Sequence, residues 1–424
     1  MDGNVVTERA VLFGINGFQY SGSDFESVWS EFIDLAKAAG AIPVAQVIQI
    51  RSNPDPAFFL GSGKAGELKD SVRETMAKLL ISLQGLSPVQ VRNLEDLTGA
   101  KVVDRTDLIL DIFAQRAKTK EGKLQVELAQ LSHLLPRLGG GLGRDLSRLG
   151  GGIGTRGPGE SKLEIDRRWV RRRIADLRRD LKLIEAHRSV QRRRREKQGV
   201  PTVALVGYTN AGKSTLFNRL TGAGVSSQGR LFDTLDPVSR CIQVSDRDEI
   251  ILLDTVGFIR DLPTQLVAAF KATLEETIRS TMLIHVMDCA SRELMEEYQA
   301  VRAVLTELKI PDKEVITVLN KSDLMESGLV LNRLCKEWSA IPVSALTGTG
   351  EEDLLDEIKN RLGKATQMVH LFIPFAEAGQ LDLIHRKARV LNEEFTAEGV
   401  KLSVEMEEPL VRHYQGFRQE GPKC

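Results

Sequence analysis

Short apolar runs alternate with amphipathic helical stretches over the first hundred residues of the chain. Strands are predicted at 11–15, 43–48, 78–82 and 101–104, and helices at 25–39 and 87–97. Such an alternation is typical of a mostly parallel sheet covered by helices. We therefore predict a small α/β domain over residues 1–105.

A long helical pattern follows from Thr106 to Leu138, and Gly122 is a candidate break in it. Its second part and the segment 161–197 carry matching apolar stripes, which indicate two helices packed antiparallel. The stripes consist of Leu124, Leu128, Leu131, Leu135 and Leu138, and of Leu163, Val170, Ile174, Leu177, Leu181 and Ile184. The S-x-x-E sequence from Ser161 to Glu164 is typical of a helix start. We predict a helical hairpin over 106–198, with a tip loop at 139–160.

Beyond residue 199 the alternation of strands and helices returns. Strands are predicted at 202–206, 240–244, 250–253, 283–287, 315–319 and 341–343. This pattern predicts a doubly wound α/β domain over 199–365. A smaller α+β appendage is expected over 366–424, with strands at 369–373, 394–396 and 401–404, a helix at 381–391 and a frayed tail from Gly416.

Composition places the chain among folded soluble proteins of several domains, with 424 residues, 42% hydrophobic and 27% charged. No run of 18 apolar residues and no export signal are present in the sequence. The four cysteines form no C-x-x-C pair, which disfavours a zinc site or a disulfide framework. We expect a cytoplasmic protein without a membrane span, and a monomer.

The formal net charge is zero, but the charge is unevenly distributed. Segment 161–197 contains 15 Lys or Arg and 6 acidic residues, an excess of +9. The preceding loop 139–160 has ten glycines interleaved with arginines. A solvated face and a flexible linker are the plain alternatives, but a basic arm of this length favours RNA contact through backbone and shape. The candidate RNA-binding residues are Arg144, Arg148, Arg156, Arg171, Arg172 and Arg173.

The clearest chemical motif is G-x-x-x-x-G-K-S over Gly207–Ser214, between a predicted strand and a predicted helix. Its glycines let backbone N–H groups surround a phosphate, and the helix N-terminus adds positive potential. Lys213 is expected to bridge the β- and γ-phosphates, and Ser214 to hold Mg²⁺.

Three further motifs follow predicted strands, and together they indicate that the nucleotide is GTP. Asp254 and Gly257 frame D-x-x-G, where Asp254 would order the magnesium shell and the Gly257 N–H would meet the γ-phosphate. Asp323 of N-K-x-D can accept from two guanine donors, and the N–H of Ala345 suits the guanine O6. The predicted GTP-binding residues are Gly207, Tyr208, Thr209, Asn210, Ala211, Gly212, Lys213, Ser214, Thr215, Phe232, Asp233, Thr234, Leu235, Asp236, Asp254, Thr255, Val256, Gly257, Asn320, Lys321, Ser322, Asp323, Ser344, Ala345 and Leu346.

The catalytic residues are predicted to be Lys213, Thr234, Gly257 and Asn210. Thr234, 20 residues past Ser214, is expected to complete the Mg²⁺ shell with Ser214. Phe258 occupies the place where many GTPases have a water-orienting glutamine, so intrinsic hydrolysis should be slow. The Asn210 side chain could hold K⁺ beside the phosphates, although it could equally only fix the loop.

A second glycine-rich sequence, Leu60 to Lys64, lacks the first motif glycine and has Ala65 in place of Ser or Thr. A turn into a helix is the preferred interpretation, and a second nucleotide site is the alternative.

With these residues in place, the chain resembles the HflX family of ribosome-associated GTPases over about residues 10–365. The resemblance is carried by Gly151–Glu160, Glu121–Leu131, Gly207–Ser214, Leu231–Pro237 and Asp254–Ile259. It implies a GTPase that binds the large (50S) ribosomal subunit, is stimulated by it, and splits or rescues stalled or stressed ribosomes. The arm and its loop would reach ribosomal RNA near the peptidyl-transferase region. A GTP-dependent ribosome-assembly or RNA-binding module, or an antibiotic-resistance factor that protects ribosomes, stays open as an alternative.

Overall fold

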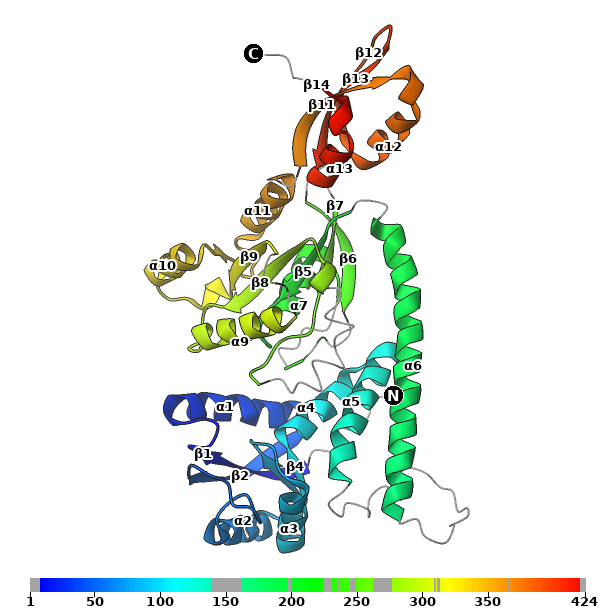
Figure 1. Ribbon diagram of the computed structural model, residues 1–424. Coiled ribbons are helices and arrows are strands. Elements are labelled where there is room, and N and C mark those ends of the chain that lie inside the picture. The colour runs from blue at the N-terminus through cyan, green and yellow to red at the C-terminus, as the bar shows by residue number, and fades with distance from the viewer. Residues whose placement is uncertain are drawn as a thin grey trace.

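Three sheets organise the part of the chain that the structure, a computed structural model, describes. The described residues are 8–138, 162–196, 200–224, 231–232, 234, 237–244, 249–261, 277–308, 310, 313–364 and 366–419. Figure 1 shows the sheets one above another, with the N-terminal sheet at the bottom and the C-terminal sheet at the top. No helix in these described ranges has the length and apolar character needed to cross a membrane.

The N-terminal unit is a four-stranded parallel sheet in the order β2-β1-β3-β4. Its elements are β1 (Glu8–Asn16), α1 (Gly22–Ala38), β2 (Ala41–Ile50), α2 (Ser62–Thr75), β3 (Leu79–Ser82), α3 (Pro88–Thr98), β4 (Lys101–Asp104) and α4 (Arg105–Arg116). Helices α1 and α4 cover the face of the sheet nearer the central unit, and α2 and α3 cover the other (Figure 1). The predicted α/β fold of this region is confirmed.

The glycine-rich sequence at 60–64 is the turn into α2. Gly61 precedes the first residue of the helix, and its N–H donates to Gln49 Oε1 at 2.9 Å. Lys64 pairs with Glu67 on the same helix, at 2.6 Å. The structure thus confirms the preferred interpretation of this sequence as a turn into a helix. The Lys64 ammonium pairs with a carboxylate of that helix.

The helical hairpin consists of α5 (Lys120–Arg137) and α6 (Lys162–Glu196). The helical pattern is interrupted as expected, but the break lies before Gly122, because the chain leaves the helix at Ala117 and re-enters it after Thr119. The Thr119 hydroxyl accepts the Gly122 N–H at 2.9 Å, so Gly122 lies in the first turn of α5. Helix α4 therefore belongs to the N-terminal unit, and α5 alone pairs with α6.

Apolar and ionic contacts join the two hairpin helices. Leu138, Val170 and Ile174 are buried together between them. Arg173 makes a two-pronged ion pair with Glu127, with distances of 2.6 and 2.8 Å. These pairings run in opposite chain directions, which confirms the predicted antiparallel hairpin.

The last turn of α5 is fastened to the first turn of α4. Arg137 donates to the carboxylates of Asp104 and Asp107, the latter at 2.7 Å. His133 Nε2 lies 3.1 Å from Asp107. Burial raises the pKa of Asp104, whereas His133 and Arg137 lower the pKa of Asp107 to about 2 against the opposing effect of its own burial. This α4–α5 latch (Asp104, Asp107, His133, Arg137) joins the hairpin to the N-terminal unit.

The central unit has a six-stranded sheet in the order β10-β9-β8-β5-β7-β6, with β6 antiparallel to β7 and the other pairs parallel. Its described elements are β5 (Thr202–Val206), α7 (Lys213–Thr221), β6 (Val238–Gln243), β7 (Glu249–Asp254), β8 (Met282–Asp288), α9 (Leu294–Glu307), β9 (Val315–Asn320), η2 (Ser322–Leu324), α10 (Gly328–Trp338), β10 (Ile341–Pro342) and α11 (Glu351–Lys364). The predicted strands appear in the predicted order, so the doubly wound fold is confirmed.

The C-terminal unit is a four-stranded sheet in the order β12-β13-β11-β14. It consists of β11 (Thr366–Pro374), η3 (Phe375–Glu377), α12 (Gly379–Lys387), β12 (Arg389–Phe395), β13 (Gly399–Glu407), α13 (Glu408–His413), η4 (Gln415–Phe417) and β14 (Arg418–Gln419). Two predictions here are wrong. The helix ends at Lys387, because residues 389–395 pair with β13. Arg418 and Gln419, within the expected frayed tail, instead pair with β11 as β14.

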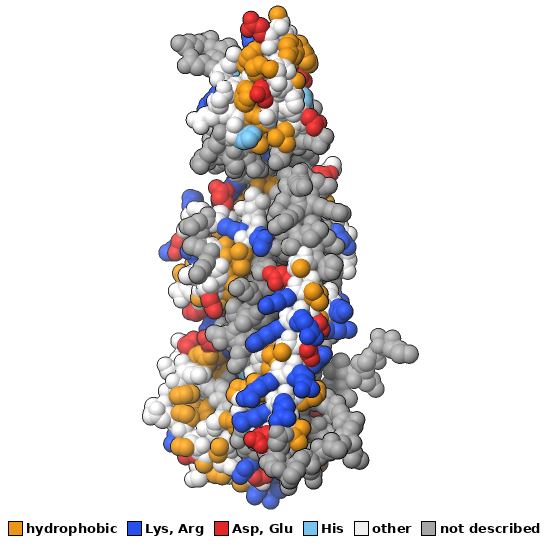
Figure 2. All heavy atoms as spheres, turned by 45° about the vertical axis from the view of Figure 1, so that its right-hand side comes forward, with side chains coloured by type: hydrophobic (Ala, Val, Ile, Leu, Met, Phe, Trp, Pro, Cys, Tyr) orange, Lys and Arg blue, Asp and Glu red, His pale blue; other side chains and the backbone are white. Residues whose placement is uncertain are grey.

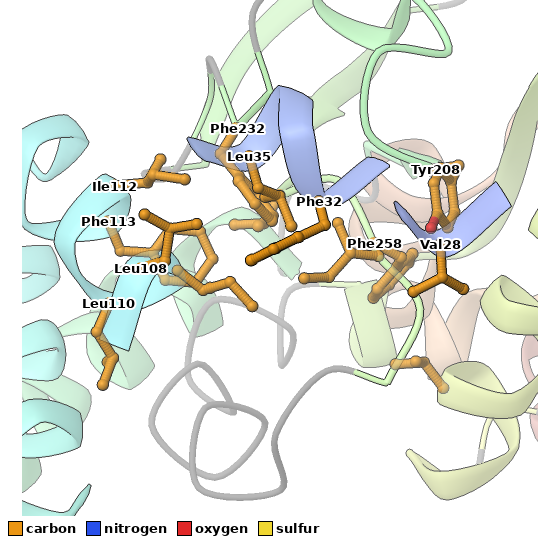
Figure 3. Close-up of a cluster of buried hydrophobic side chains, with 14 of the residues drawn as sticks. Val28, Phe32, Leu35, Leu108, Leu110, Ile112, Phe113, Tyr208, Phe232 and Phe258 are labelled. Atoms are coloured by element: carbon orange, nitrogen blue, oxygen red, sulfur yellow. The ribbon is translucent and has the colours of Figure 1, made fainter. Parts of the chain in front are cut away.

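One apolar core is shared by two units. Helices α1 and α4 of the N-terminal unit pack with segments that surround the carboxyl ends of the central strands (Figure 3). Phe113 of α4 and Phe232 meet edge to face, with ring centroids 4.6 Å apart. The N-terminal unit is thus seated on the end of the central sheet where the predicted nucleotide motifs lie.

Candidate nucleotide site

The loop from Gly207 to Gly212 joins β5 to α7, and its two motif glycines have no room for a side chain. Gly207 has φ +155°, and a Cβ there would lie 2.2 Å from the Val286 carbonyl oxygen. Gly212 has φ +92°, and a Cβ there would lie 2.2 Å from Asn320 Nδ2. Only glycine permits this close approach of neighbouring strands and the left-handed turn that begins α7.

Lys213, the first residue of α7, is buried and turns back over the loop. Its Nζ donates to the carbonyl oxygens of Gly207, at 3.0 Å, and Tyr208, at 2.7 Å. Burial lowers the pKa of Lys213 to about 8, against the opposing effect of Asp254. A desolvated ammonium held inside a glycine-rich loop is suited to receive a polyanion. Asn210 projects from the same loop in a left-handed conformation, and it is exposed.

Two hydroxyls converge on one carboxylate at the end of β7. Ser214 Oγ and Thr234 Oγ1 lie 2.7 and 2.8 Å from Asp254 Oδ2, and 2.8 Å from each other. The other carboxylate oxygen, Asp254 Oδ1, is buried without a hydrogen-bond partner among the described residues. Burial raises the pKa of Asp254, and the two hydroxyl donors oppose that rise. Two hydroxyls and a carboxylate form an all-oxygen set of the kind that suits Mg²⁺.

Gly257 lies directly against the phosphate loop. A Cβ on it would lie 2.9 Å from Thr209 Cα and 3.0 Å from Lys213 Nζ. The next residue, Phe258, pairs with the loop backbone: the Thr209 N–H donates to its carbonyl at 2.8 Å, and its N–H donates to Gly207 O at 3.1 Å. The Phe258 ring is 2% exposed and points into the core shared with α1 (Figure 3).

The two base-recognition loops are connected through Asn320. Its Nδ2 donates to Ala211 O at 2.8 Å, and its Oδ1 accepts the Ala345 N–H at 3.0 Å. The N–H that was expected to meet the guanine O6 is thus held by Asn320. Asp323 accepts from the Ser344 hydroxyl at 2.5 Å, and Lys321 is paired with Asp288 at 2.7 Å.

The structure brings most of the predicted nucleotide residues to one end of the central sheet. Thr255 donates its hydroxyl to Leu205 O at 2.6 Å, and Leu346 is exposed on the base side. Three of the predicted residues, Asp233, Leu235 and Asp236, lie outside the described residues, as do the tip-loop candidates Arg144, Arg148 and Arg156.

The predicted RNA-binding residues of α6 lie apart from this end of the sheet and differ among themselves. Arg171 and Arg172 are exposed, whereas Arg173 is half-buried in its ion pair with Glu127. Burial and this ion pair make Arg173 a component of the hairpin rather than a freely presented cation.

Sequence reasoning missed the N-terminal residues that border the site. Glu31 of α1 accepts from the Tyr208 hydroxyl, and Arg105 of α4 donates to the Arg260 carbonyl at 2.8 Å. Both residues come from elements that are more than 90 residues away in sequence. Two sequence features could have indicated this role. Glu31 is an acidic residue on the buried side of α1, and Arg105 directly follows a buried strand.

The chain matches three family profiles in succession. They are described as GTP-binding GTPase N-terminal over residues 26–114, GTP-binding GTPase Middle Region over 116–195, and 50S ribosome-binding GTPase over 202–321. Together they cover the N-terminal unit, the hairpin and most of the central unit.

Curated relatives are similar over nearly the whole chain. GTPase HflX of Caldanaerobacter subterraneus is 45% identical over 94% of this chain and 91% of the relative. GTPase HflX of Escherichia coli is 44% identical over 97% of this chain and 96% of the relative. A GTP-binding protein from Sulfolobus solfataricus in complex with GDP is 30% identical over 84% of this chain and 98% of that chain, with a TM-score of 0.45.

The extent and identity of the two HflX matches agree with the motif order and with the geometry around Gly207–Ser214. The chain therefore belongs to the HflX family of GTPases, and its reaction is the hydrolysis of GTP to GDP and phosphate.

Proposed function

We propose that this GTPase is a switch that binds the large ribosomal subunit through its helical arm and splits or rescues stalled 70S ribosomes, with hydrolysis stimulated by the ribosome. The observation that carries the proposal is the exposed basic face of α6. The description of the matched central profile, 50S ribosome-binding GTPase, agrees with it.

The basic face consists of arginines and a lysine that α6 presents away from α5. Its exposed members between residues 164 and 186 are Arg168, Arg171, Arg172, Arg178, Arg179 and Lys182. Figure 2 shows Lys and Arg side chains following one another along this helix with few acidic side chains between them. Such a row of cations fits the phosphate backbone of structured RNA, which is recognised by charge and shape.

The basic helix of the arm is long. Helix α6 has 35 residues, which at ~1.5 Å per residue gives a rod of about 50 Å. It stands beside both the N-terminal and the central units (Figure 1). We infer that the tip loop 139–160, at the end of this rod, carries Arg144, Arg148 and Arg156 to the RNA.

We further propose that Ser214 and Thr234 hold Mg²⁺ directly and that Asp254 orders its shell. The convergence of both hydroxyls on Asp254 and the buried Asp254 Oδ1 support this assignment. Bound there, the ion would neutralise charge on the β- and γ-phosphates. The exposed Asn210 is our candidate ligand for K⁺ on the other side of the phosphates. Equal single-turnover rates in potassium and sodium would contradict that role.

Sedimentation with purified 50S subunits tests the arm. We compare the triple variant Arg171→Gln, Arg172→Gln, Arg178→Gln with a matched control of the same charge, Lys69→Gln, Arg73→Gln, Arg92→Gln, on the exposed side of α2 and α3. The arm variant should bind more weakly, and the slope of log affinity against log salt should decrease by about 2. Equal binding by both variants would contradict the proposal.

The same proteins distinguish a switch from a passive module. A switch predicts that 50S subunits raise the GTPase rate strongly and that 70S particles dissociate in sucrose gradients with GTP. An RNA-binding assembly module predicts binding with little change in turnover. The variant Arg144→Ala, Arg148→Ala, Arg156→Ala should keep its nucleotide affinity and lose ribosome splitting.

A further inference from the structure

Three segments that surround the nucleotide site share one contact surface, and that surface is the N-terminal unit. Tyr208 comes from the phosphate loop, Phe232 precedes Thr234 by two residues, and Phe258 follows Gly257. All three rings are at least 93% buried, and they pack in one core with α1 and α4 (Figure 3). A change in the position of any of these segments therefore alters contacts with α1 or α4.

A closed set of hydrogen bonds lies beside this core, which we call the Arg260 network (Glu31, Arg105, Tyr208, Arg260). The Tyr208 hydroxyl donates to Glu31 and accepts the Arg260 N–H at 2.9 Å. Arg105 Nη2 contacts Glu31 Oε1 at 2.7 Å and the Arg260 carbonyl at 2.8 Å. Both backbone polar groups of Arg260 are thus engaged, the N–H by the phosphate loop and the carbonyl by the N-terminal unit.

The Arg260 network is buried, so its charged groups depend on one another for their hydrogen bonds. The Arg105 side chain is 7% exposed and that of Glu31 is 11% exposed. Burial and Glu31 raise the pKa of Tyr208, so its hydroxyl is present as a donor. A buried charge pair is stable only while both partners keep their hydrogen bonds. The Arg260 side chain adds a second connection, to Asp24 of α1 at 3.2 Å and to Glu293 at 3.0 Å.

The network fixes one end of a four-residue segment whose other end serves the chemistry. Gly257 lies against Lys213, and Phe258 is paired with the backbone of Gly207 and Thr209. Arg260 is held two residues later by Tyr208 and Arg105. With both ends held, the Gly257 N–H has a defined position relative to the phosphate loop. Only the triphosphate has a γ-phosphate for that N–H to contact.

We propose that Arg105 and Tyr208 are positioning residues for GTP hydrolysis: from the N-terminal unit and the phosphate loop they hold the backbone of Arg260, and so place the Gly257 N–H for the γ-phosphate. The inference goes beyond ribosome binding, and it is tested without ribosomes. It predicts an effect on the triphosphate state alone, since GDP has no γ-phosphate for the Gly257 N–H to contact.

The test uses two mild variants, Tyr208→Phe and Arg105→Lys. Tyr208→Phe removes one hydroxyl and keeps the buried ring. Arg105→Lys keeps a positive charge beside Glu31 but replaces the planar guanidinium, whose Nη2 contacts both Glu31 and the Arg260 carbonyl, with a shorter ammonium. We measure the dissociation constants for GDP and for a non-hydrolysable GTP analogue, and the single-turnover hydrolysis rate. Each variant should lose about tenfold in analogue affinity or turnover, with GDP affinity within about twofold of the parent.

Arg137→Lys is the matched control, because Arg137 also pairs with two carboxylates, those of the buried Asp104 and the partly exposed Asp107, and neither ion pair involves a residue of the segment 257–260. It should lower the melting temperature and leave the ratio of analogue to GDP affinity unchanged. The proposal is overturned if Tyr208→Phe and Arg105→Lys leave analogue affinity and turnover intact. It is equally overturned if affinity for both nucleotides falls in parallel, which is the signature of general loosening.

Discussion

Ser214 and Thr234, 20 residues apart in sequence, have their hydroxyl oxygens 2.8 Å from each other and share the oxygen Oδ2 of Asp254. Removing the Thr234 hydroxyl in Thr234→Ala should therefore cost a metal ligand. We expect the magnesium-dependent hydrolysis rate to fall about 10- to 100-fold, with GDP affinity nearly unchanged, as measured by phosphate release in a magnesium titration.

Thr221→Ala is the control for this substitution. The Thr221 hydroxyl donates to the Phe217 carbonyl at the end of α7, at 2.7 Å, away from Asp254. Its magnesium titration should match that of the parent protein. A Thr234→Ala protein with parental rates at every magnesium concentration would remove Thr234 from the metal site.

Guanine selectivity should depend on the Asp323 carboxylate. In Asp323→Asn, an amide N–H₂ faces the N1–H and N2–H₂ donors of guanine, so two donors oppose one another. Xanthine has a carbonyl at position 2 and can accept from that amide. We expect GTP affinity to fall at least about 100-fold and XTP to become the better substrate, measured by competition binding. Unchanged preference for GTP would place base recognition elsewhere.

Installing glutamine at Phe258 should not create a faster GTPase. The ring is 2% exposed in the core shared with α1, so Phe258→Gln would bury an amide among apolar side chains. We expect a loss of about 3 kcal/mol in the free energy of unfolding and a GTPase rate no higher than that of the parent protein. Phe258→Leu, which stays apolar, should lose less stability. An accelerated rate in the glutamine variant would show that residue 258 can reach the attacking water.

The stability of the central unit should decrease in acid through His285. Burial lowers the pKa of this histidine to about 3, and Lys213 and Arg302 add to the shift. The unfolded chain takes up the proton near pH 6.5 while the folded state does not. The histidine therefore leaves the free energy of unfolding unchanged above pH ~6.5 and lowers it progressively as the pH falls towards 3. At pH 5 the loss should be about 2 kcal/mol.

Urea unfolding at pH 7.5 and pH 5, followed by circular dichroism, measures this effect. Other titrating groups contribute to both proteins, so the difference between the parent and His285→Gln isolates the histidine. The variant should show about 2 kcal/mol less pH dependence than the parent protein. Equal pH dependence in the two proteins would contradict the prediction.

The central sheet could be predicted because its strands are buried runs of apolar residues, several of which end at motif residues. Val203–Val206 and Ile250–Leu253 are almost wholly buried, and each is followed by residues with a recognisable spacing. The helical region was harder, since the apolar periodicity of α4 continues into α5 across a break of three residues. The Thr119 hydroxyl caps the start of α5 and so marks its separation from α4. Apolar periodicity does not predict such a local hydrogen bond.

The motif spacing predicts which residues lie around the phosphate loop, and the structure adds contact partners that spacing cannot predict. Phe258 shows this limit. The sequence shows an apolar residue where many GTPases have a glutamine, but the side chains that surround the ring come from α1, more than 200 residues earlier. Glu31 and Arg105 belong to no motif, because their role exists only once two units are packed together. Contacts between domains depend on surface pairing, which local sequence patterns do not encode.

Asp104 and Arg105 are consecutive residues at the start of α4, and they face different partners. Asp104 holds Arg137, the last residue of α5 before the chain leaves towards the arm tip, and Arg105 holds the backbone of Arg260. The hairpin and the segment that follows Gly257 are therefore anchored one peptide bond apart, so that unfolding of this turn would release both anchors at once.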